Sequence, residues 1–185
     1  MPRYALSVLG ACRPLLWQGD WLARQLSFFD RWAVVLEAAA ATDGTARVLE
    51  DVARRYPDRV RLEVAPARGW PAPLDALRAG AHGLRGEDEV AYLWLVYPGE
   101  VWAPDQLRAA EVYLRAAAAP AGRVGLRVRL PDGEPLDPPL QLPRLWRWRG
   151  ELFAEAAEPR LAGQRGFVDI PACGDRWQGL PASYL

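Results

Sequence analysis

The sequence contains neither lysine nor asparagine, and it has one histidine, one methionine and two cysteines among its 185 residues. Cys12 and Cys173 are too few, and too far apart in the sequence, for a disulfide framework or a zinc site, so we interpret them as unpaired, partly buried thiols. A Walker pattern and a Gly-x-Gly-x-x-Gly run are also missing. These absences exclude the common phosphate-binding loops.

Net charge is absent as well, because 23 basic and 23 acidic groups cancel. A balanced charge favours neither nucleic acid nor an anionic membrane as a partner. The longest apolar stretches, such as Ala33–Ala41, are far shorter than the ~20 residues of a membrane-spanning helix, and the N-terminus lacks the pattern of a secretory leader. We therefore expect a soluble, cytoplasmic protein without a membrane span.

The residues that are present predict one globular domain over residues 1–185, since 51% of them are hydrophobic and nine are tryptophan. Short apolar runs predict strands at Tyr4–Leu9, Trp32–Leu36 and Val90–Val96, and alternating apolar residues predict strands at Val60–Val64 and Val124–Leu130. Helical spacing of apolar residues predicts helices over Leu15–Phe29, from a Thr42–Thr45 cap to Tyr56, over Leu74–Leu84, and from Pro104 to Ala118. Strands that alternate with helices in this way are typical of a Rossmann-like, three-layer α/β/α fold with a mainly parallel central sheet.

The alternation stops after Pro131. We expect proline-rich turns over Pro131–Pro143, two short strands at Arg144–Arg149 and Leu152–Glu155, and then a tail rich in glycine and proline.

Four stretches carry a resemblance to a known family, and they stand in the same order as in that family. They are AVVLEAAAATDGTARVLEDV (Ala33–Val52), ARGWPAPLDALRAG (Ala67–Gly80), AYLWLVYPGEVWAPDQL (Ala91–Leu107) and RLWRWRGELFAEAAEPRL (Arg144–Leu161). Together they resemble the family-two glycosyltransferases, in the branch whose second strand ends in Glu and whose fourth ends in Asp-x-Asp-Glu-x-Trp. The resemblance implies the A-type glycosyltransferase fold, with a nucleotide-binding α/β core over residues 1–130 and acceptor-side strands and a tail over residues 131–185.

The first two stretches match the nucleotide side of that family. Glu37 corresponds to the acid after the second strand, and Asp43 to the acid of the Ser-Thr-Asp-Gly-Thr helix start. A carboxylate at such a place can accept hydrogen bonds from a base or a ribose hydroxyl. Trp70 matches the family's tryptophan, whereas Arg78 stands near the place of an asparagine. The Thr42–Thr45 segment is equally well explained as a helix cap alone.

The third stretch matches the family except at its centre. Glu100 and Trp102 match the Glu-x-Trp pair, but Tyr97 and Gly99 stand where the family has its two acids. In the family those acids hold the ribose and a divalent cation that neutralises the diphosphate leaving group. Because a tyrosine and a glycine cannot supply two carboxylates, we expect no ordinary metal site and no metal cofactor.

The fourth stretch also matches the family at some positions and lacks its polar residues at others. Trp146 and Arg147 match a Trp-Arg-aromatic run, whereas Ala156 and Ala157 stand where the family has His-Glu. The resemblance thus implies a site that has lost polar groups in two separate segments.

Two further features each admit two interpretations. His82 at a helix end either complements the helix dipole or takes part in catalysis. On the strand at Arg144–Arg149, Trp146 and Trp148 share one face with Arg144, and Arg147 and Arg149 share the other. This pattern suits either stacking on a base or sugar, or a sheet edge packed by tryptophan with solvated arginines.

The resemblance implies a glycosyltransferase-like protein that binds a nucleotide or nucleotide sugar, with hexosyl transfer weak or lost and the catalytic residues unassigned. Its predicted nucleotide-binding residues are Glu37, Asp43, Arg68, Trp70, Arg78 and Tyr97, and its predicted substrate-pocket residues are Glu100, Trp102, Trp146 and Arg147. Arg68 or Arg78 would take the place of the cation, since guanidinium pairs bidentately with phosphate. The alternative is a non-catalytic interaction or self-association module on the same fold, which leaves a homo-oligomer open.

Overall fold

The computed structural model describes residues 1–9, 22–36, 44–64, 73–84, 90–97, 99–129, 134, 138–155 and 158–177. Its strands are β1 (Arg3–Leu9), β2 (Arg31–Leu36), β3 (Val60–Val64), β4 (Ala91–Leu95), β5 (Glu100–Val101), β6 (Ala121–Arg129), β7 (Leu140–Trp148), β8 (Phe153–Ala154), β9 (Arg160–Leu161) and β10 (Val168–Trp177). Its helices are the 3-10 helix η1 (Leu26–Phe28) and the α-helices α2 (Thr45–Arg55), α3 (Pro73–Gly83) and α4 (Pro104–Ala116).

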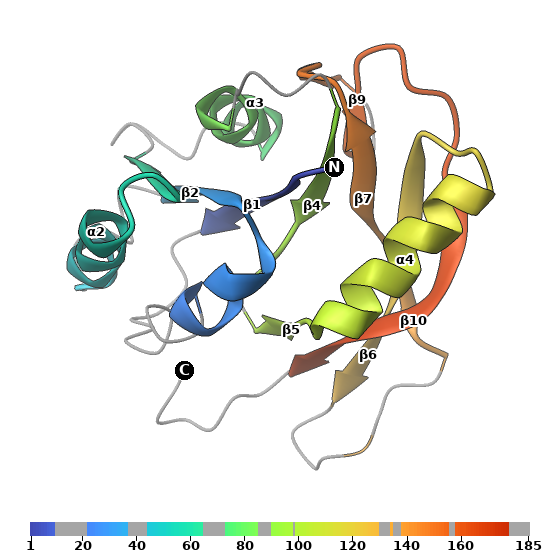
Figure 1. Ribbon diagram of the computed structural model, residues 1–185, viewed down its shortest axis with the longest axis horizontal. Helices are drawn as coiled ribbons and strands as arrows, with labels where there is room; N and C mark the ends of the chain where they lie inside the picture. The colour runs from blue at the N-terminus through green and yellow to red at the C-terminus, as the bar shows by residue number, and fades with distance from the viewer. Residues whose placement is uncertain are drawn as a thin grey trace.

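Eight of these strands form one sheet in the order β3-β2-β1-β4-β7-β6-β10-β5 (Figure 1). The strands β3, β2, β1 and β4 run parallel to one another. β7 is antiparallel to both β4 and β6, and β10 is parallel to β6, so β6 and β10 run in the same direction as β4. The predicted mainly parallel sheet is therefore confirmed, with β7 and the short β5 as the reversed strands.

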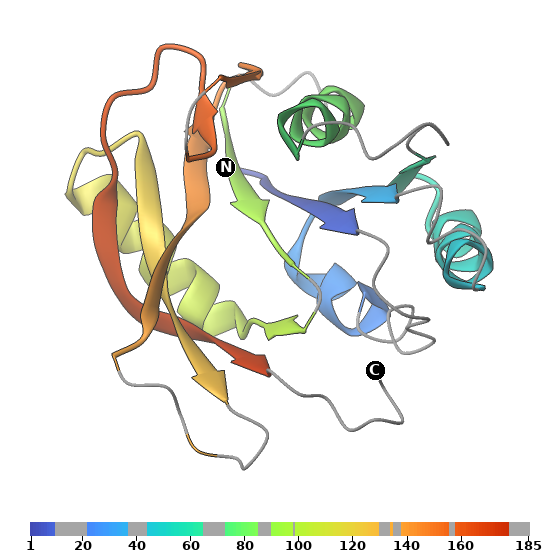
Figure 2. The same ribbon diagram turned by 180° about the vertical axis from the view of Figure 1, so that it is seen from behind.

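The helices cover both faces of the sheet, because the central strands are apolar on both sides. Every residue of β4 is buried. One core cluster joins β1, β2 and β4 to α2, α4 and the residues before η1, and the other joins the opposite face to α3, β8 and β9. Figure 2, seen from behind, has α3 and α4 on opposite sides of the strands. These layers confirm the predicted α/β/α fold.

The N-cap of α2 is a glycine, and Thr42 and Asp43 of the predicted cap lie outside the described residues. Gly44 occupies the N-cap position with a φ of 89°, and no side chain there hydrogen-bonds to the helix. Glycine adopts this left-handed geometry without the steric cost that a Cβ brings. The predicted end at Tyr56 is confirmed, since α2 ends at Arg55 with Tyr56 as its C-cap.

The C-terminal third is more regular than the sequence suggested. β7 begins at Leu140, inside the segment predicted as turns, and passes through Pro143 where the β6–β7 register shifts. β10 occupies part of the predicted tail, with a register shift between Ile170 and Gly174. Proline is accommodated in a sheet at such irregularities, because its missing N–H then leaves no ladder bond unmade. β7 is thus an interior strand, which corrects the sheet-edge interpretation of its tryptophans.

A partly buried ion pair joins α4 to the first strand. The Arg3 guanidinium donates to Glu111 on α4, with Nη2 2.7 Å from Oε2, and the Trp94 indole donates to the same carboxylate over 3.0 Å. The hydrogen bond to Glu111 raises the pKa of Arg3, which stays a cation. No helix in the described part of the chain has the length and apolar character needed to cross a membrane.

Candidate functional site

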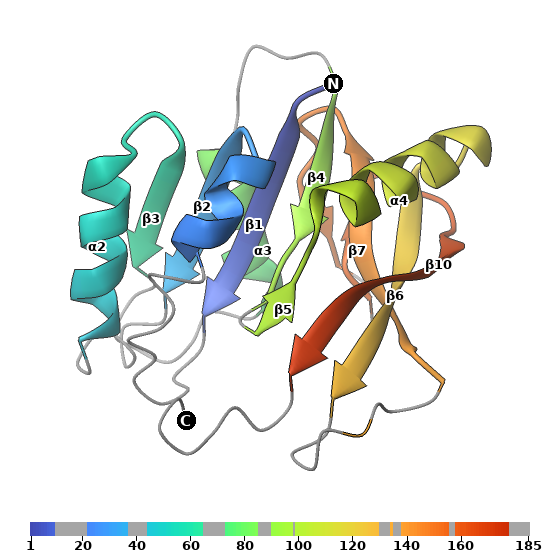
Figure 3. The ribbon, with the colours of Figure 1, turned by 60° about the horizontal axis from the view of Figure 1, so that its bottom comes forward.

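The carboxyl ends of the parallel strands meet at one edge of the sheet, as their arrowheads show in Figure 3. Leu9 at the end of β1 pairs with Leu36 at the end of β2, and Leu95 of β4 pairs with Leu6 of β1. In open α/β sheets this edge is where ligands bind. The sequence predicts that Glu37 and the Tyr97–Glu100 segment follow neighbouring strands. In the structure β1 lies between β2 and β4, so the strands that precede these two segments are not adjacent.

A tight turn follows β4 at this edge. The N–H of Glu100 donates to the carbonyl of Tyr97 over 3.1 Å, and Gly99 has a φ of 82°. That φ at the third position of a turn is the geometry of a type II turn, which strongly prefers glycine. The glycine at position 99 therefore has a local reason, since an L-residue there is strained.

Glu100 closes the turn with its side chain and is itself held by an arginine. Its Oε2 accepts the N–H of Tyr97 over 3.1 Å, while Arg144 on β7 donates from Nη2 and Nε to Oε1 over 2.8 and 3.1 Å. Glu100 is 0% exposed and Arg144 is 5% exposed. The Arg144 guanidinium also lies 4.6 Å from the centre of the Tyr97 ring. A permanent cation is thus buried beneath the turn and neutralised by a carboxylate.

Gln25, from the N-terminal part of the chain, hydrogen-bonds to the backbone of the residues at the end of the turn. The Gln25 side chain donates to the Glu100 carbonyl and accepts the N–H of Trp102, both over 3.2 Å. The Trp102 indole is 1% exposed and packs edge-on against Trp94 at 5.1 Å. Trp102 is therefore a core residue that anchors the turn, and its ring offers no surface to a ligand.

A second hydrogen-bonded chain fixes the end of β4. The buried hydroxyl of Ser7 donates to the Val96 carbonyl over 2.6 Å and accepts the indole N–H of Trp32 over 2.9 Å. β1, β2 and β4 are joined by these bonds just before the turn. The turn consequently sits on a rigid support, which is the arrangement expected of a preorganised site.

The other predicted residues divide into two groups. Glu37, Asp43, Arg68 and Trp70 lie outside the described residues. Trp146 and Arg147 pair with Leu93 and Tyr92, the third and second residues of β4, which precede its carboxyl end. Trp146 is 0% exposed and its indole donates to Gln164 over 3.0 Å, so it does not present a stacking face.

Arg78 and His82 both lie on α3. Arg78 donates from Nε to the Phe153 carbonyl over 2.8 Å, and its Nη1 lies 3.4 Å from Asp75. The guanidinium is thus directed at β8. His82 stands in the last turn of the helix, as predicted, where a cation complements the helix dipole.

Among the described residues, no group of three or more His, Cys, Asp or Glu side chains lies close enough together to bind a metal ion. At the β4 turn, Tyr97 offers one neutral oxygen, Gly99 offers none, and both Glu100 oxygens already accept hydrogen bonds. Hard divalent cations need several oxygen ligands, with carboxylates among them.

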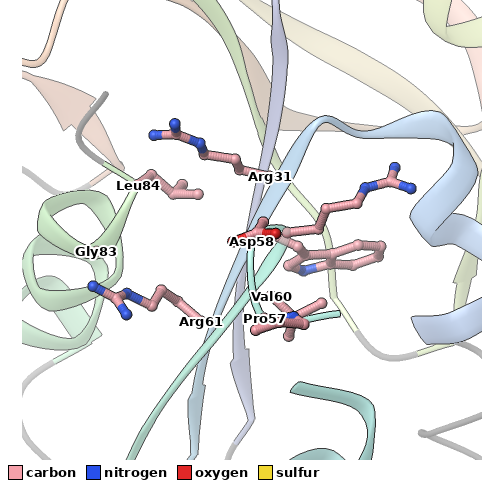
Figure 4. Close-up of a pocket in the computed structure, with 9 residues that line it drawn as sticks. Arg31, Pro57, Asp58, Val60, Arg61, Gly83 and Leu84 are labelled. Atoms are coloured by element: carbon pink, nitrogen blue, oxygen red, sulfur yellow. The ribbon is translucent and has the colours of Figure 1, made fainter. Parts of the chain in front are cut away.

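A small cavity lies at the opposite edge of the sheet. It measures about 150 Å³ and is lined by residues at the amino ends of β2 and β3, among them Arg31, Asp58 and Arg61 (Figure 4). Ligand pockets for small molecules occupy ~300 Å³ or more. This cavity is too small for a nucleotide, and its place at the amino ends of the strands separates it from the β4 turn.

Comparison with known proteins shows the fold. The sequence matches no family model and no curated protein. A crystal structure of residues 1–349 of TarS from S. aureus superposes with a TM-score of 0.54 at 11% identity, over 96% of this chain and 61% of that one. This chain has an A-type glycosyltransferase-like fold. A 4-diphosphocytidyl-2C-methyl-D-erythritol synthase superposes with a TM-score of 0.48 at 14% identity, over 80% of this chain and 76% of that one.

Sequence reasoning missed the two residues that hold the turn, Arg144 and Gln25. A signal for Arg144 was present, because it shares a strand face with Trp146 and Trp148, and an arginine on a buried face needs an acid partner. No comparable pattern marks Gln25, whose partners are backbone groups 75 and 77 residues away.

Proposed function

We propose that this chain is a glycosyltransferase-like protein that binds a nucleotide or nucleotide sugar at the carboxyl ends of β1, β2 and β4. The observation that carries the proposal is the Tyr97–Glu100 turn, which stands after β4 on a fold similar to that of TarS, a glycosyltransferase. Glu37 is the next residue in the sequence after the last residue of β2, and together with Asp43 it is the proposed acceptor of hydrogen bonds from the base or ribose.

Binding without a divalent metal follows from the chemistry of the turn. Tyr97 and Gly99 replace two carboxylates, and the nearby cation Arg144 is already neutralised by Glu100. Arg78 is engaged by Phe153 and Asp75. In the proposal, Arg68 therefore meets the charge of the diphosphate, and Trp70, two residues later in the sequence, is available for stacking.

Transfer is weak or lost in this proposal. The departure of a nucleoside diphosphate develops negative charge, and the loss of one preorganised partner for such charge commonly costs ~100 to 1,000-fold in rate. The turn lacks both acids of the family, and Ala156 stands where the family has a histidine. The protein would act as a nucleotide-responsive module rather than as a fast catalyst.

The test is a thermal-shift screen of uridine, cytidine and guanosine diphosphates and their sugar conjugates, in chelator and in manganese. We expect one nucleotide class to raise the melting temperature in both conditions. Glu37→Gln should abolish the shift, whereas the control Asp58→Asn should keep it, because Asp58 lies at the opposite edge of the sheet. No shift with any nucleotide, or equal loss in both variants, contradicts the proposal.

A further inference from the structure

β3 is an end strand of the sheet whose outer backbone groups face away from β2. Trp32 of β2 pairs with Val60, and its N–H donates to the Arg59 carbonyl over 2.6 Å. Backbone groups alternate sides along a strand, so those of Arg61 and Glu63 point toward β2 and those of Leu62 and Val64 point outward. Among the described residues, no strand pairs with this outer side.

The sequence of β3, Val-Arg-Leu-Glu-Val, is self-complementary about its central residue. In an antiparallel pair centred on Leu62, Arg61 of each copy faces Glu63 of the other, and Val60 faces Val64. We propose that two copies of this chain associate through β3 in this register, so that their two sheets become one continuous sheet across a two-fold axis. A two-fold axis requires the same patch on both copies to be complementary to itself, and this strand meets that requirement.

The outward-pointing backbone groups of β3 favour the same register, centred on Leu62, that pairs Arg61 with Glu63. Centring the pair on Leu62 uses the N–H and carbonyl groups that point outward. Arg61 and Glu63 then form the pairs without direct hydrogen bonds, in which facing side chains lie closest. Centring on Arg61, or pairing the strands in parallel, would place Arg61 against its own copy and is disfavoured by like-charge repulsion.

Both charged side chains lie on the face of the sheet that α3 covers. A Cβ placed on Gly83 of α3 would lie 2.8 Å from a Glu63 oxygen and 3.9 Å from the Arg61 Cβ. The two cross-copy ion pairs would therefore form beside the end of α3, partly shielded from solvent.

The other face supplies apolar surface. Val64 is 52% exposed, and a hollow of about 510 Å³ runs along β3, lined also by Glu50, Ala53 and Arg54 of α2. Glu50 and Arg54 stand about one helical turn apart on α2. Two α2 helices that meet antiparallel across the same axis would again bring an acid to a base.

A strand of five residues makes a small interface, so the dimer should be weak and concentration-dependent. The proposal does not depend on nucleotide binding, because β3 pairs through its edge and the nucleotide is placed at the carboxyl ends of the strands.

Sedimentation velocity of the full chain from about 1 to 500 µM, a range suited to weak interfaces, tests the proposal. We expect a monomer–dimer equilibrium. Glu63→Arg and Arg61→Glu should each raise the dissociation constant at least tenfold, since each turns two attractive pairs into two repulsive ones. The exposed control Arg108→Glu on α4 should leave it unchanged. A monomer at every concentration, or a Glu63→Arg dimer as strong as the unmodified one, overturns the proposal.

Two complementation experiments separate pairing from folding defects. The double variant Arg61→Glu/Glu63→Arg restores opposite charges in the same register and should recover the dimer. An equimolar mixture of the two single variants should form a heterodimer, because one then carries two acids and the other two bases at β3. Failure of both the double variant and the mixture, with circular dichroism showing folded chains, contradicts the register and the proposal.

Discussion

Replacing Arg144 by methionine should destabilise the protein severely, because it leaves the Glu100 carboxylate buried without its cation. Glu100 is 0% exposed and accepts three contacts from Arg144 at 2.8, 3.1 and 3.3 Å. Breaking a buried ion pair from one side costs ~3–5 kcal/mol, since the remaining charge stays desolvated. For a chain of this length that loss lowers the melting temperature by roughly 6–20 °C.

The double variant Glu100→Gln/Arg144→Met isolates the interaction. It removes both charges and keeps an amide oxygen as acceptor for the N–H of Tyr97. We expect it to lose much less stability than the sum of the two single variants, with a coupling energy of about 2–3 kcal/mol.

Urea unfolding followed by circular dichroism measures all three variants. The control is Arg54→Met, which breaks the solvent-exposed pair with Asp51 and should cost no more than about 0.5 kcal/mol. If Arg144→Met costs as little as Arg54→Met, or if the two single losses simply add, the pair does not hold the turn as described.

Three further predictions concern the same turn. Gly99→Ala should cost about 1 kcal/mol in urea unfolding, because the φ of 82° strains any residue with a Cβ, and an unchanged stability would contradict the type II turn. Ser7→Ala should cost about 2 kcal/mol by removing the buried hydroxyl that accepts the Trp32 indole N–H and donates to the Val96 carbonyl, and a loss below about 0.5 kcal/mol would contradict this role of Ser7. The rate at which the protein releases nucleoside diphosphate should stay below about one turnover per second with every donor sugar. The double variant Tyr97→Asp/Gly99→Asp should not raise this rate, since an aspartate at position 99 is strained where glycine stands. A faster rate in the unmodified protein would identify a metal-independent transferase.

The sequence was informative where local patterns decide structure. Apolar runs located β1, β2 and β4, because a strand covered on both faces must be apolar throughout. The end strand β3 was located by its alternation of apolar and charged residues. The limits of α3 and α4 followed from apolar spacing and from Pro104 at a first helical position. β7 and β10 were harder, since Pro143 and Pro171 argue against strands unless a register shift accommodates them, and such a shift is set by the partner strand.

For the site too, the sequence predicted what local patterns determine and did not predict the long-range contacts. The place of Tyr97 and Glu100 after β4 could be predicted, because the resemblance fixes the order of strands. The burial of Glu100 could not, since its partner Arg144 is 44 residues away and its backbone is held by Gln25. Trp146 matched the family in sequence yet lies in the core, because an interior strand buries both of its faces.

Titration calorimetry of the unmodified protein with the nucleotide selected by the thermal screen, in chelator and again in manganese, tests the central claim most directly. We expect one site per chain and an affinity that differs by less than about tenfold between the two conditions, or ~1.4 kcal/mol. Binding that requires manganese would show that the turn does assemble a metal site, and the absence of binding heat in both conditions would contradict a nucleotide site at this edge of the sheet.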